Sequence, residues 1–85
     1  MSRFVWSVEK DRALKAVRGV SFDEVMGWVL VDIIQHPTRP GQKMYIFAHD
    51  DYCWVVPCVI SGEIIFLKTI YRSRKFTLRY LRKGL

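Results

Sequence analysis

Glycine and histidine, on which many enzyme active sites depend, are both scarce in this sequence. The five glycines occur singly, so no glycine-rich loop is present to hold a phosphate group. The two histidines, His36 and His49, stand apart, and no serine, threonine or cysteine carries the signature of an activated nucleophile. A dinucleotide-binding fold does not fit into 85 residues. The sequence therefore excludes nucleotide-dependent enzymes, and we expect no cofactor.

Cysteine is also rare, and neither copy forms a known motif. Cys53 and Cys58 have neither C-x-x-C nor zinc-ribbon spacing. Residues five apart on a strand point to opposite faces, which disfavours a disulfide between them. We expect both to be buried and reduced, as in a cytoplasmic protein. His49, Asp50 and Asp51 are adjacent, but three neighbouring residues rarely point at one ion, so we predict a turn there and no metal site.

Long hydrophobic runs are missing as well. The longest apolar stretch, Cys53 to Ile60, has the length of a strand, so we expect no contact with a membrane. Charges interrupt every apolar run among residues 1–10, which is unlike a signal peptide. Half of the chain is nevertheless hydrophobic (51%), which argues against disorder. The sequence predicts one small domain over residues 1–85.

Acidic residues are few, and the basic excess lies in the second half of the chain. Residues 1–42 hold six basic and five acidic residues, a net of +1, whereas residues 43–85 hold eight and three, a net of +5. Between Lys68 and Lys83 there are seven basic residues and no acidic one. Such a balance points to an anionic partner, with nucleic acid the first candidate.

Helix signals are clear at the start of the chain. Ser7 to Arg18 reads as a helix that Ser7 caps and that ends before Gly19. Ser21 and Glu24 form a capping box for a second, short helix that begins at Phe22 and ends near Gly27 or Trp28.

Strand signals follow. The predicted strands are Leu30–Ile34, Lys43–His49, Tyr52–Ile60 and Glu63–Tyr71, separated by a loop over His36–Gln42, a turn at Asp50-Asp51 and a hairpin turn at Ser61-Gly62. Because Pro57 cannot donate a ladder hydrogen bond, we expect an edge segment or a bulge there. A terminal helix over Arg72–Leu81, capped by Ser73, completes an α+β fold with two N-terminal helices, a four-stranded antiparallel sheet and a short C-terminal helix.

The basic segment Lys68–Lys75 is the strongest candidate for a functional site. Arg72, Arg74 and Lys75 follow the last predicted strand, where side chains can spread around a cleft, and arginine presents a planar fork to two phosphate oxygens. Tyr71 and Tyr80 could stack on unpaired bases. A solvated basic surface, or one that meets an acidic protein, explains the same residues equally well.

These segments resemble the BrnT-type toxins of the RelE/ParE superfamily. Phe4–Trp6 followed by a lysine-bearing helix resembles their F-x-W-D opening, and Arg18–Val25 resembles their K-H-G turn and S-F-E-E-A capping box, with Val17–Gly19 standing where the family has K-H-G. Lys68–Thr77 is similar to their closing R-x-I-S-A-R-x-A-T segment. The resemblance follows nearly the whole chain in order.

The resemblance implies a toxin of a type II toxin–antitoxin system. Its activity would be metal-independent endoribonuclease cleavage of RNA, either free mRNA or mRNA on the ribosome, that inhibits translation. The partners would be a cognate antitoxin and, only through that antitoxin, operator DNA. Two other hypotheses use the same basic corner: a non-catalytic RNA- or protein-binding module, and a toxin-like scaffold that docks an antitoxin to corepress DNA.

The resemblance also assigns roles to residues. Arg74 matches the arginine of the S-A-R segment and would clamp the transition-state phosphate, with Lys68 or Arg72 sharing that role. Lys68 or Lys75 would be the general base, and Tyr71 or Tyr80 the general acid. Lys15 and Arg18 would close the other side of the cleft. The RNA-binding candidates are therefore Lys15, Arg18, Lys75, Arg79 and Tyr80.

Overall fold

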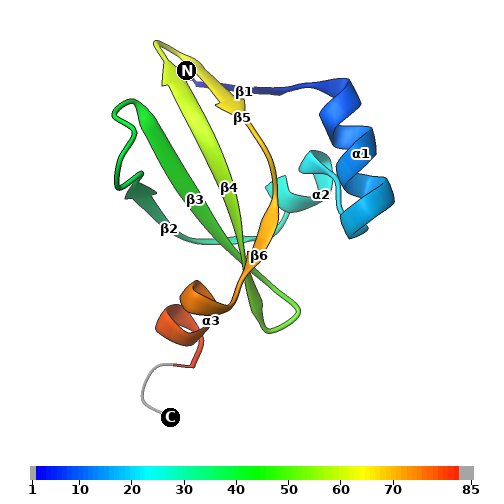
Figure 1. The fold of residues 1–85 in the computed structure, drawn as a ribbon, viewed down its shortest axis with the longest axis vertical. Helices are drawn as coiled ribbons and strands as arrows, with labels where there is room; N and C mark the ends of the chain where they lie inside the picture. The colour runs from blue at the N-terminus through cyan, green and yellow to red at the C-terminus, as the bar shows by residue number, and fades with distance from the viewer. Residues whose placement is uncertain (1, 83–85) are drawn as a thin grey trace.

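The computed structural model describes residues 2–82, which form three helices and six strands (Figure 1). In chain order these are β1 (Arg3–Trp6), α1 (Val8–Arg18), α2 (Phe22–Met26), β2 (Val29–Gln35), β3 (Gln42–His49), β4 (Tyr52–Ser61), β5 (Ile64–Leu67), β6 (Tyr71–Ser73) and α3 (Arg74–Tyr80). Lys83, the last residue of the basic run, lies outside these residues. The predicted α+β class is confirmed, with α1 and α2 beside the sheet and α3 near the end of the β3–β4 hairpin. The predicted four-stranded antiparallel sheet is wrong, because the sheet is mixed and contains six strands. No helix within residues 2–82 is long and apolar enough to cross a membrane.

The two N-terminal helices begin and end where the sequence signals place them. Helix α1 (Val8–Arg18) starts at Ser7, whose Oγ accepts a hydrogen bond from the Lys10 N–H at 3.2 Å. It ends at Gly19, which adopts a left-handed φ of 75° that glycine tolerates without steric cost. Helix α2 (Phe22–Met26) carries the predicted capping box between Ser21 and Glu24.

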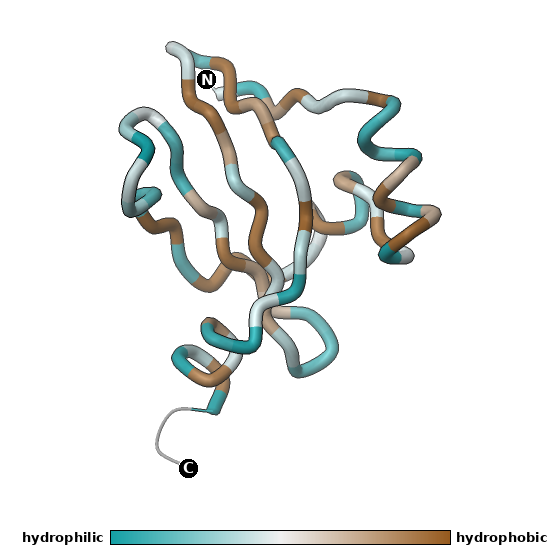
Figure 2. The backbone as a smooth tube through the Cα atoms, viewed as in Figure 1, coloured by the Kyte–Doolittle hydropathy of each residue, from teal (hydrophilic) through white to brown (hydrophobic). Residues whose placement is uncertain are grey.

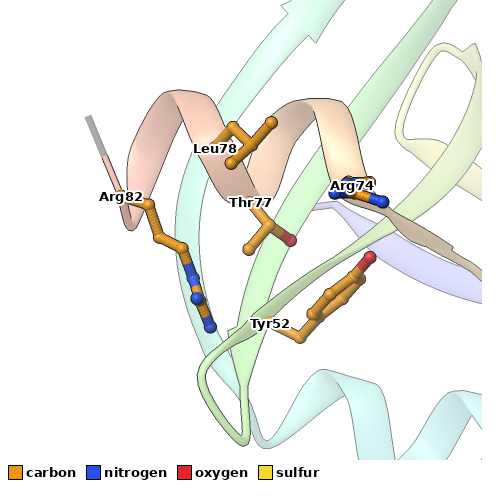
Figure 3. Close-up of a pocket in the computed structure, with 5 residues that line it drawn as sticks. All are labelled: Tyr52, Arg74, Thr77, Leu78 and Arg82. Atoms are coloured by element: carbon orange, nitrogen blue, oxygen red, sulfur yellow. The ribbon is translucent and has the colours of Figure 1, made fainter. Parts of the chain in front are cut away.

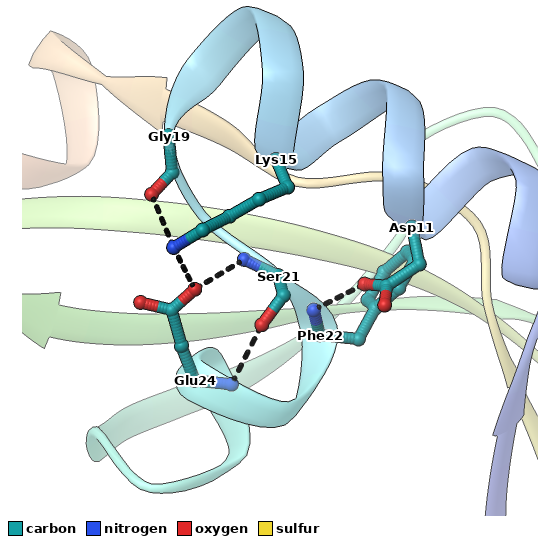
Figure 4. A network of polar contacts seen from close by, with 6 residues as sticks. All are labelled: Asp11, Lys15, Gly19, Ser21, Phe22 and Glu24. Carbon is teal, nitrogen blue, oxygen red and sulfur yellow. Dashed lines mark hydrogen bonds and ion pairs between the residues drawn. The ribbon is translucent and has the colours of Figure 1, made fainter.

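A polar network ties α1 to α2 (Figure 4). The Lys15 ammonium lies 2.7 Å from a Glu24 carboxylate oxygen and donates to the Gly19 carbonyl at 3.3 Å. Asp11 accepts a hydrogen bond from the Phe22 N–H at 2.8 Å. The Lys15 ammonium and the Ser21 N–H together hold the pKa of Glu24 below its ordinary value. These contacts fix the angle at which the chain turns from α1 into α2.

The strand order is β1-β5-β4-β3-β2, and β6 pairs with the part of β4 that β5 leaves open. Strand β1 (Arg3–Trp6) pairs in parallel with β5 (Ile64–Leu67). Neither β1 nor this parallel pairing was predicted from the sequence. Four residues give too short a pattern to identify a strand, and the partner strand lies about 60 positions further along the chain.

One predicted strand is in fact two. The predicted strand Glu63–Tyr71 is broken into β5 and β6 (Tyr71–Ser73), which pair with different parts of β4 (Tyr52–Ser61). The break lies opposite Pro57, whose carbonyl accepts from the Lys68 N–H at 2.9 Å but which has no N–H to continue the ladder. Three residues of the partner, 68–70, oppose two of β4, so the irregularity predicted at Pro57 is confirmed.

The remaining boundaries differ by one or two residues from the predictions. Strand β2 (Val29–Gln35) is longer than predicted, and β3 (Gln42–His49) pairs with β4 around the predicted two-residue turn at Asp50-Asp51. The second hairpin turns at residues 62–63 rather than 61–62. Helix α3 (Arg74–Tyr80) begins after Ser73, its predicted cap, so Arg72 belongs to β6 and not to the helix.

The central strands are buried on both faces, which explains their hydrophobic sequences (Figure 2). One face packs against α1 and α2, where Phe22, Val25 and Leu14 share a hydrophobic cluster with Phe47 and Val56. The other face packs against α3, where Phe76 meets a smaller cluster formed by Ile46, Cys53 and Val55. Successive residues of β3 and β4 thus point to opposite faces of the sheet and pack into two separate hydrophobic clusters.

Thr77 anchors α3 to the sheet. Its side chain is buried, and its Oγ1 accepts from the Cys53 N–H at 2.8 Å while donating to the Ser73 carbonyl at 2.7 Å. Because the first residue of α3 is one turn before Thr77, this pair of hydrogen bonds also sets the position of Arg74 at the end of the sheet.

The two cysteines should be chemically inert in the native protein. Both are buried and unpaired, as predicted, and burial raises the pKa of Cys58 to about 12 and that of Cys53 above its ordinary value. We expect neither thiol to react with iodoacetamide at pH 8 in native buffer, and both to react in urea, as read by mass spectrometry. Rapid modification of either thiol in native buffer would contradict this burial.

Candidate functional site

A stack of one arginine on two aromatic rings stands at the end of the sheet where β6 leads into α3. The Arg72 guanidinium carbon lies 4.3 Å from the centroid of the Tyr52 ring and 5.7 Å from that of Trp54. The backbone explains the contact, because β6 pairs with the start of β4 and places Arg72 opposite Trp54. Such a contact holds the guanidinium over the rings and leaves its N–H groups able to bind a ligand.

An open pocket of about 280 Å³ lies on one side of this stack, which we call the α3 pocket (Figure 3). It is lined by Tyr52, Arg74, Thr77, Leu78 and Arg82. In Figure 3 the Tyr52 ring from β4 and the Arg74 side chain from the first turn of α3 lie close together, with the Tyr52 hydroxyl toward Arg74. The predicted leading residue, Arg74, therefore lines a pocket.

A second open pocket, of about 390 Å³, lies on the other side, which we call the α1 pocket. It is lined by Val17 and Arg18 from the end of α1, and by Trp54, Tyr71 and Arg72 from the sheet. The Arg18 guanidinium donates to the Ile70 carbonyl at 2.8 Å, which holds it over the strand. Because Arg72 lines this pocket and stacks on Tyr52 of the other, the two pockets meet at the stack.

Among the described residues 2–82, four arginines line the two pockets, and no acidic side chain lines either. Within residues 2–82 only one of the four pairs with a carboxylate, since Arg82 lies 3.2 Å from an exposed oxygen of Asp51. Arg18, Arg72 and Arg74 thus keep their positive charge uncompensated next to an open surface. Together they make a concentrated positive field of the kind that attracts anionic oxygens.

Several predicted residues lie at these pockets. Arg74, Arg72, Tyr71 and Arg18 line them, although they come from α1, β6 and α3. Burial raises the pKa of Tyr71, so its hydroxyl stays protonated at neutral pH. Lys68, predicted as a catalytic residue, is half-buried in the break between β5 and β6 and lines neither pocket.

The other predicted RNA-binding residues lie outside both pocket linings. Lys15 is engaged with Glu24 and Gly19 between α1 and α2. Lys75 and Arg79 lie over the Phe76 ring at 5.5 and 5.3 Å. Their predicted roles stay predictions.

Tyr80, the last residue of α3, packs against the cluster around Ile46 and Phe76, and its hydroxyl donates to Asp32 at 2.5 Å. This hydrogen bond, with one from the Ile33 N–H, lowers the pKa of Asp32, and it raises the pKa of Tyr80. Tyr80 therefore has a clear structural role, which joins α3 to the edge strand β2.

Replacing Tyr80 should make stability less dependent on pH. We expect Tyr80→Phe to lower the urea midpoint at pH 7. The pair contributes stability above about pH 4, the ordinary pKa of aspartate, and the contribution is lost as pH falls through the lowered pKa of Asp32. The difference in urea midpoint between the wild type and the variant should therefore become smaller towards pH 2. Asp32→Asn should reproduce the loss at pH 7, and a pH-independent gap would contradict the assignment.

His49 lies close to the site but was predicted only as part of a turn. Asp50 and Asp51 do form that turn, with positive φ values of 52° and 61°. The His49 ring stacks on Trp28 at 4.0 Å with an interplanar angle of 4°, and Trp28 in turn contacts Trp54. No group of three or more metal-ligating side chains is present among residues 2–82.

Sequence reasoning missed the β4 part of the site. Tyr52 and Trp54 sit two apart on one strand face, and the start of β4 lies beside Arg72 only through pairing with β6. The alternation of β4 could have shown that the two aromatic residues share a face. Arg82 is in the basic run but follows α3, and its place in the α3 pocket depends on how α3 docks.

Comparison with known proteins identifies the fold. No family model matches the sequence, and no curated protein matches it. The structure is similar to the 1.1 Å crystal structure of the Brucella abortus ribonuclease toxin BrnT, with a TM-score of 0.57 and 14% sequence identity. The match covers 86% of this chain and 97% of that one. The chain has a BrnT-like fold. This confirms the fold implied by the sequence resemblance, and the wider RelE/ParE relationship stays a prediction.

Proposed function

We propose that this protein is a ribonuclease toxin, an endoribonuclease that cuts RNA without a metal ion and blocks translation in the cytoplasm. The observation that carries the proposal is the set of uncompensated arginines around two joined pockets, with aromatic rings between them. RNA is the anion that uses both features, since arginine binds its phosphates and aromatic rings stack on its bases. The shared fold with a ribonuclease toxin supports the same conclusion.

A small site can catalyse this reaction, because RNA supplies its own nucleophile. The 2′-hydroxyl gives its proton to water, and its oxygen forms a bond to phosphorus while the bond from phosphorus to the 5′-oxygen breaks, leaving a 2′,3′-cyclic phosphate and a 5′-hydroxyl. Arg74 and Arg72, two residues apart across the junction of β6 and α3, would hold the non-bridging oxygens as negative charge builds on them. Tyr71, protonated at neutral pH, would give a proton to the leaving 5′-oxygen.

The proposed protein partner is an antitoxin that neutralises this site. An acidic segment of the antitoxin would be drawn to the arginines and would cover both pockets, which excludes RNA from them. Operator DNA would be bound only through the antitoxin.

One observation favours a second function, RNA binding without cleavage. Within residues 2–82 no histidine, lysine or carboxylate lines either pocket, so this part of the chain supplies no residue there that readily takes the proton of the 2′-hydroxyl near neutral pH. Lys68 and Lys75, the predicted bases, lie outside the linings.

Induced expression separates the two functions. Expression of the wild type should stop growth and produce new RNA ends, whereas Arg74→Ala, made at the same level, should do neither. Growth without RNA cleavage in cells that hold folded wild-type protein would overturn the toxin proposal and leave the binding function.

A further inference from the structure

We infer that the α1 pocket is a base-specific subsite that accepts one unpaired guanine of the RNA. The inference rests on the proposed RNA substrate and adds which base is selected and by which residues. The pocket is lined by two aromatic residues, Trp54 and Tyr71, and by two arginines, Arg18 from α1 and Arg72 from β6. Its volume of about 390 Å³ falls in the range of small-ligand pockets.

The aromatic lining requires an unpaired base. Trp54 is half-buried, and its ring is held by tilted contact with Trp28 at a centroid distance of 5.3 Å. Because the Arg72 guanidinium also lies over this ring, 5.7 Å from its centroid, a base would stack on the Tyr71 ring beside it, and stacking needs a base that is out of a duplex. The pocket therefore favours single-stranded RNA.

The polar rim decides which base fits. Arginine has five N–H donors and no acceptor, and each guanidinium is held, Arg18 by the Ile70 carbonyl and Arg72 by its contact with the Tyr52 ring. One bond from Arg18 to Ile70 leaves its other donors for a ligand. A rim of donors suits guanine, whose O6 and N7 are adjacent acceptors that arginine binds with two hydrogen bonds.

The same rim disfavours the other bases. Adenine and cytosine present an amino group, which would meet the arginine donors as a second donor. Uracil offers one acceptor on the corresponding edge, O4, where guanine offers two. Each good two-bond contact discriminates by roughly ten-fold in affinity, so guanine should be favoured by about that factor.

The place of this pocket also fits the cleavage geometry. The α1 pocket meets the α3 pocket at Arg72, so a base held in the first leaves its own phosphate near Arg72 and Arg74. The guanine would thus lie next to the cut phosphate.

Binding of uncleavable RNA tests the inference apart from catalysis. Fluorescein-labelled tetranucleotides with 2′-O-methyl groups throughout, UGUU and UAUU, would be titrated with the full chain and followed by anisotropy. We expect UGUU to bind about ten-fold more tightly than UAUU. We expect Arg18→Lys, which keeps the charge but not the fork, to reduce that preference to about two-fold or less. Equal binding of the two oligonucleotides to the wild type would overturn the inference.

A pair of exposed valines on α1 supplies a matched control. Val17 lines the pocket and is 80% exposed, whereas Val8 is 61% exposed at the other end of the helix. We expect Val17→Glu to weaken UGUU binding by ten-fold or more, and Val8→Glu to change it by less than three-fold, with circular dichroism confirming that both fold. Equal weakening by the two substitutions would show that net charge, and not the pocket, governs binding.

The outcomes also distinguish this inference from the proposed function. RNA cleavage without preference for guanine would overturn the subsite and leave the ribonuclease. Guanine-specific binding without cleavage would overturn the ribonuclease and leave the subsite.

Discussion

Replacing Arg74 by alanine should reduce the rate of RNA cleavage by roughly 100- to 1,000-fold, since that is the typical cost of removing one donor to transition-state charge. Arg74 has no carboxylate partner within residues 2–82 and lines the α3 pocket beside Tyr52, so its charge is directed at the open site. The loss should appear in kcat under single-turnover conditions with a labelled RNA, because the negative charge on phosphorus is greatest in the transition state.

Two further variants make the Arg74 result specific. Arg74→Lys keeps the charge but loses the planar fork, so we expect an intermediate rate. Arg39→Ala removes the same charge from the loop before β3, at the opposite end of that strand from the site, and should leave kcat unchanged. A full rate for Arg74→Ala, or an equal loss for Arg39→Ala, would remove Arg74 from the reaction.

Replacing Phe22 by alanine should lower the free energy of unfolding by about 3–5 kcal/mol, the usual cost of deleting a buried phenylalanine. Phe22 is fully buried, stacks on Trp6 at 5.6 Å and lies between α2 and the sheet. A domain of this length is stable by only about 4–13 kcal/mol, so the variant should lose a large share of its stability.

Urea unfolding measures this effect, with Phe4→Ala as the matched control. Phe4 contacts Tyr45 edge to face but is 42% exposed on the edge strand β1, so we expect a clearly smaller loss. A loss below about 1 kcal/mol for Phe22→Ala would mean that the contact between α2 and the sheet is not the main core.

Local chemistry made much of this fold predictable. Ser7, Gly19 and Ser21 mark helix ends because they supply hydrogen-bond partners to backbone groups that the helix leaves unpaired. Each of these groups lies within one turn of the residue that pairs with it. The strand β1 was missed because its partner is distant in sequence, and the break between β5 and β6 depends on which side of Pro57 faces a neighbour. Both are properties of the assembled sheet.

The functional site was likewise predictable from the sequence only in part. Arg72 and Arg74 could be placed at the end of a strand from sequence alone, since their position follows from the order of elements. Lys15 was predicted at the cleft, but Glu24 holds its ammonium between α1 and α2, and Tyr80 is held by Asp32. Such pairings are formed by tertiary contacts and leave no periodic pattern in the sequence.

The most direct test of the central claim is the chemistry of the cut ends. Purified protein in excess EDTA would be given an RNA that it cuts at one site, and the same RNA with a single 2′-deoxynucleotide on the 5′ side of that site. We expect the all-ribose RNA to be cut to leave a 2′,3′-cyclic phosphate and a 5′-hydroxyl, and the deoxy substrate to stay intact there. Cleavage of the deoxy substrate, ends bearing a 3′-hydroxyl and a 5′-phosphate, or loss of all cleavage in EDTA would contradict this claim.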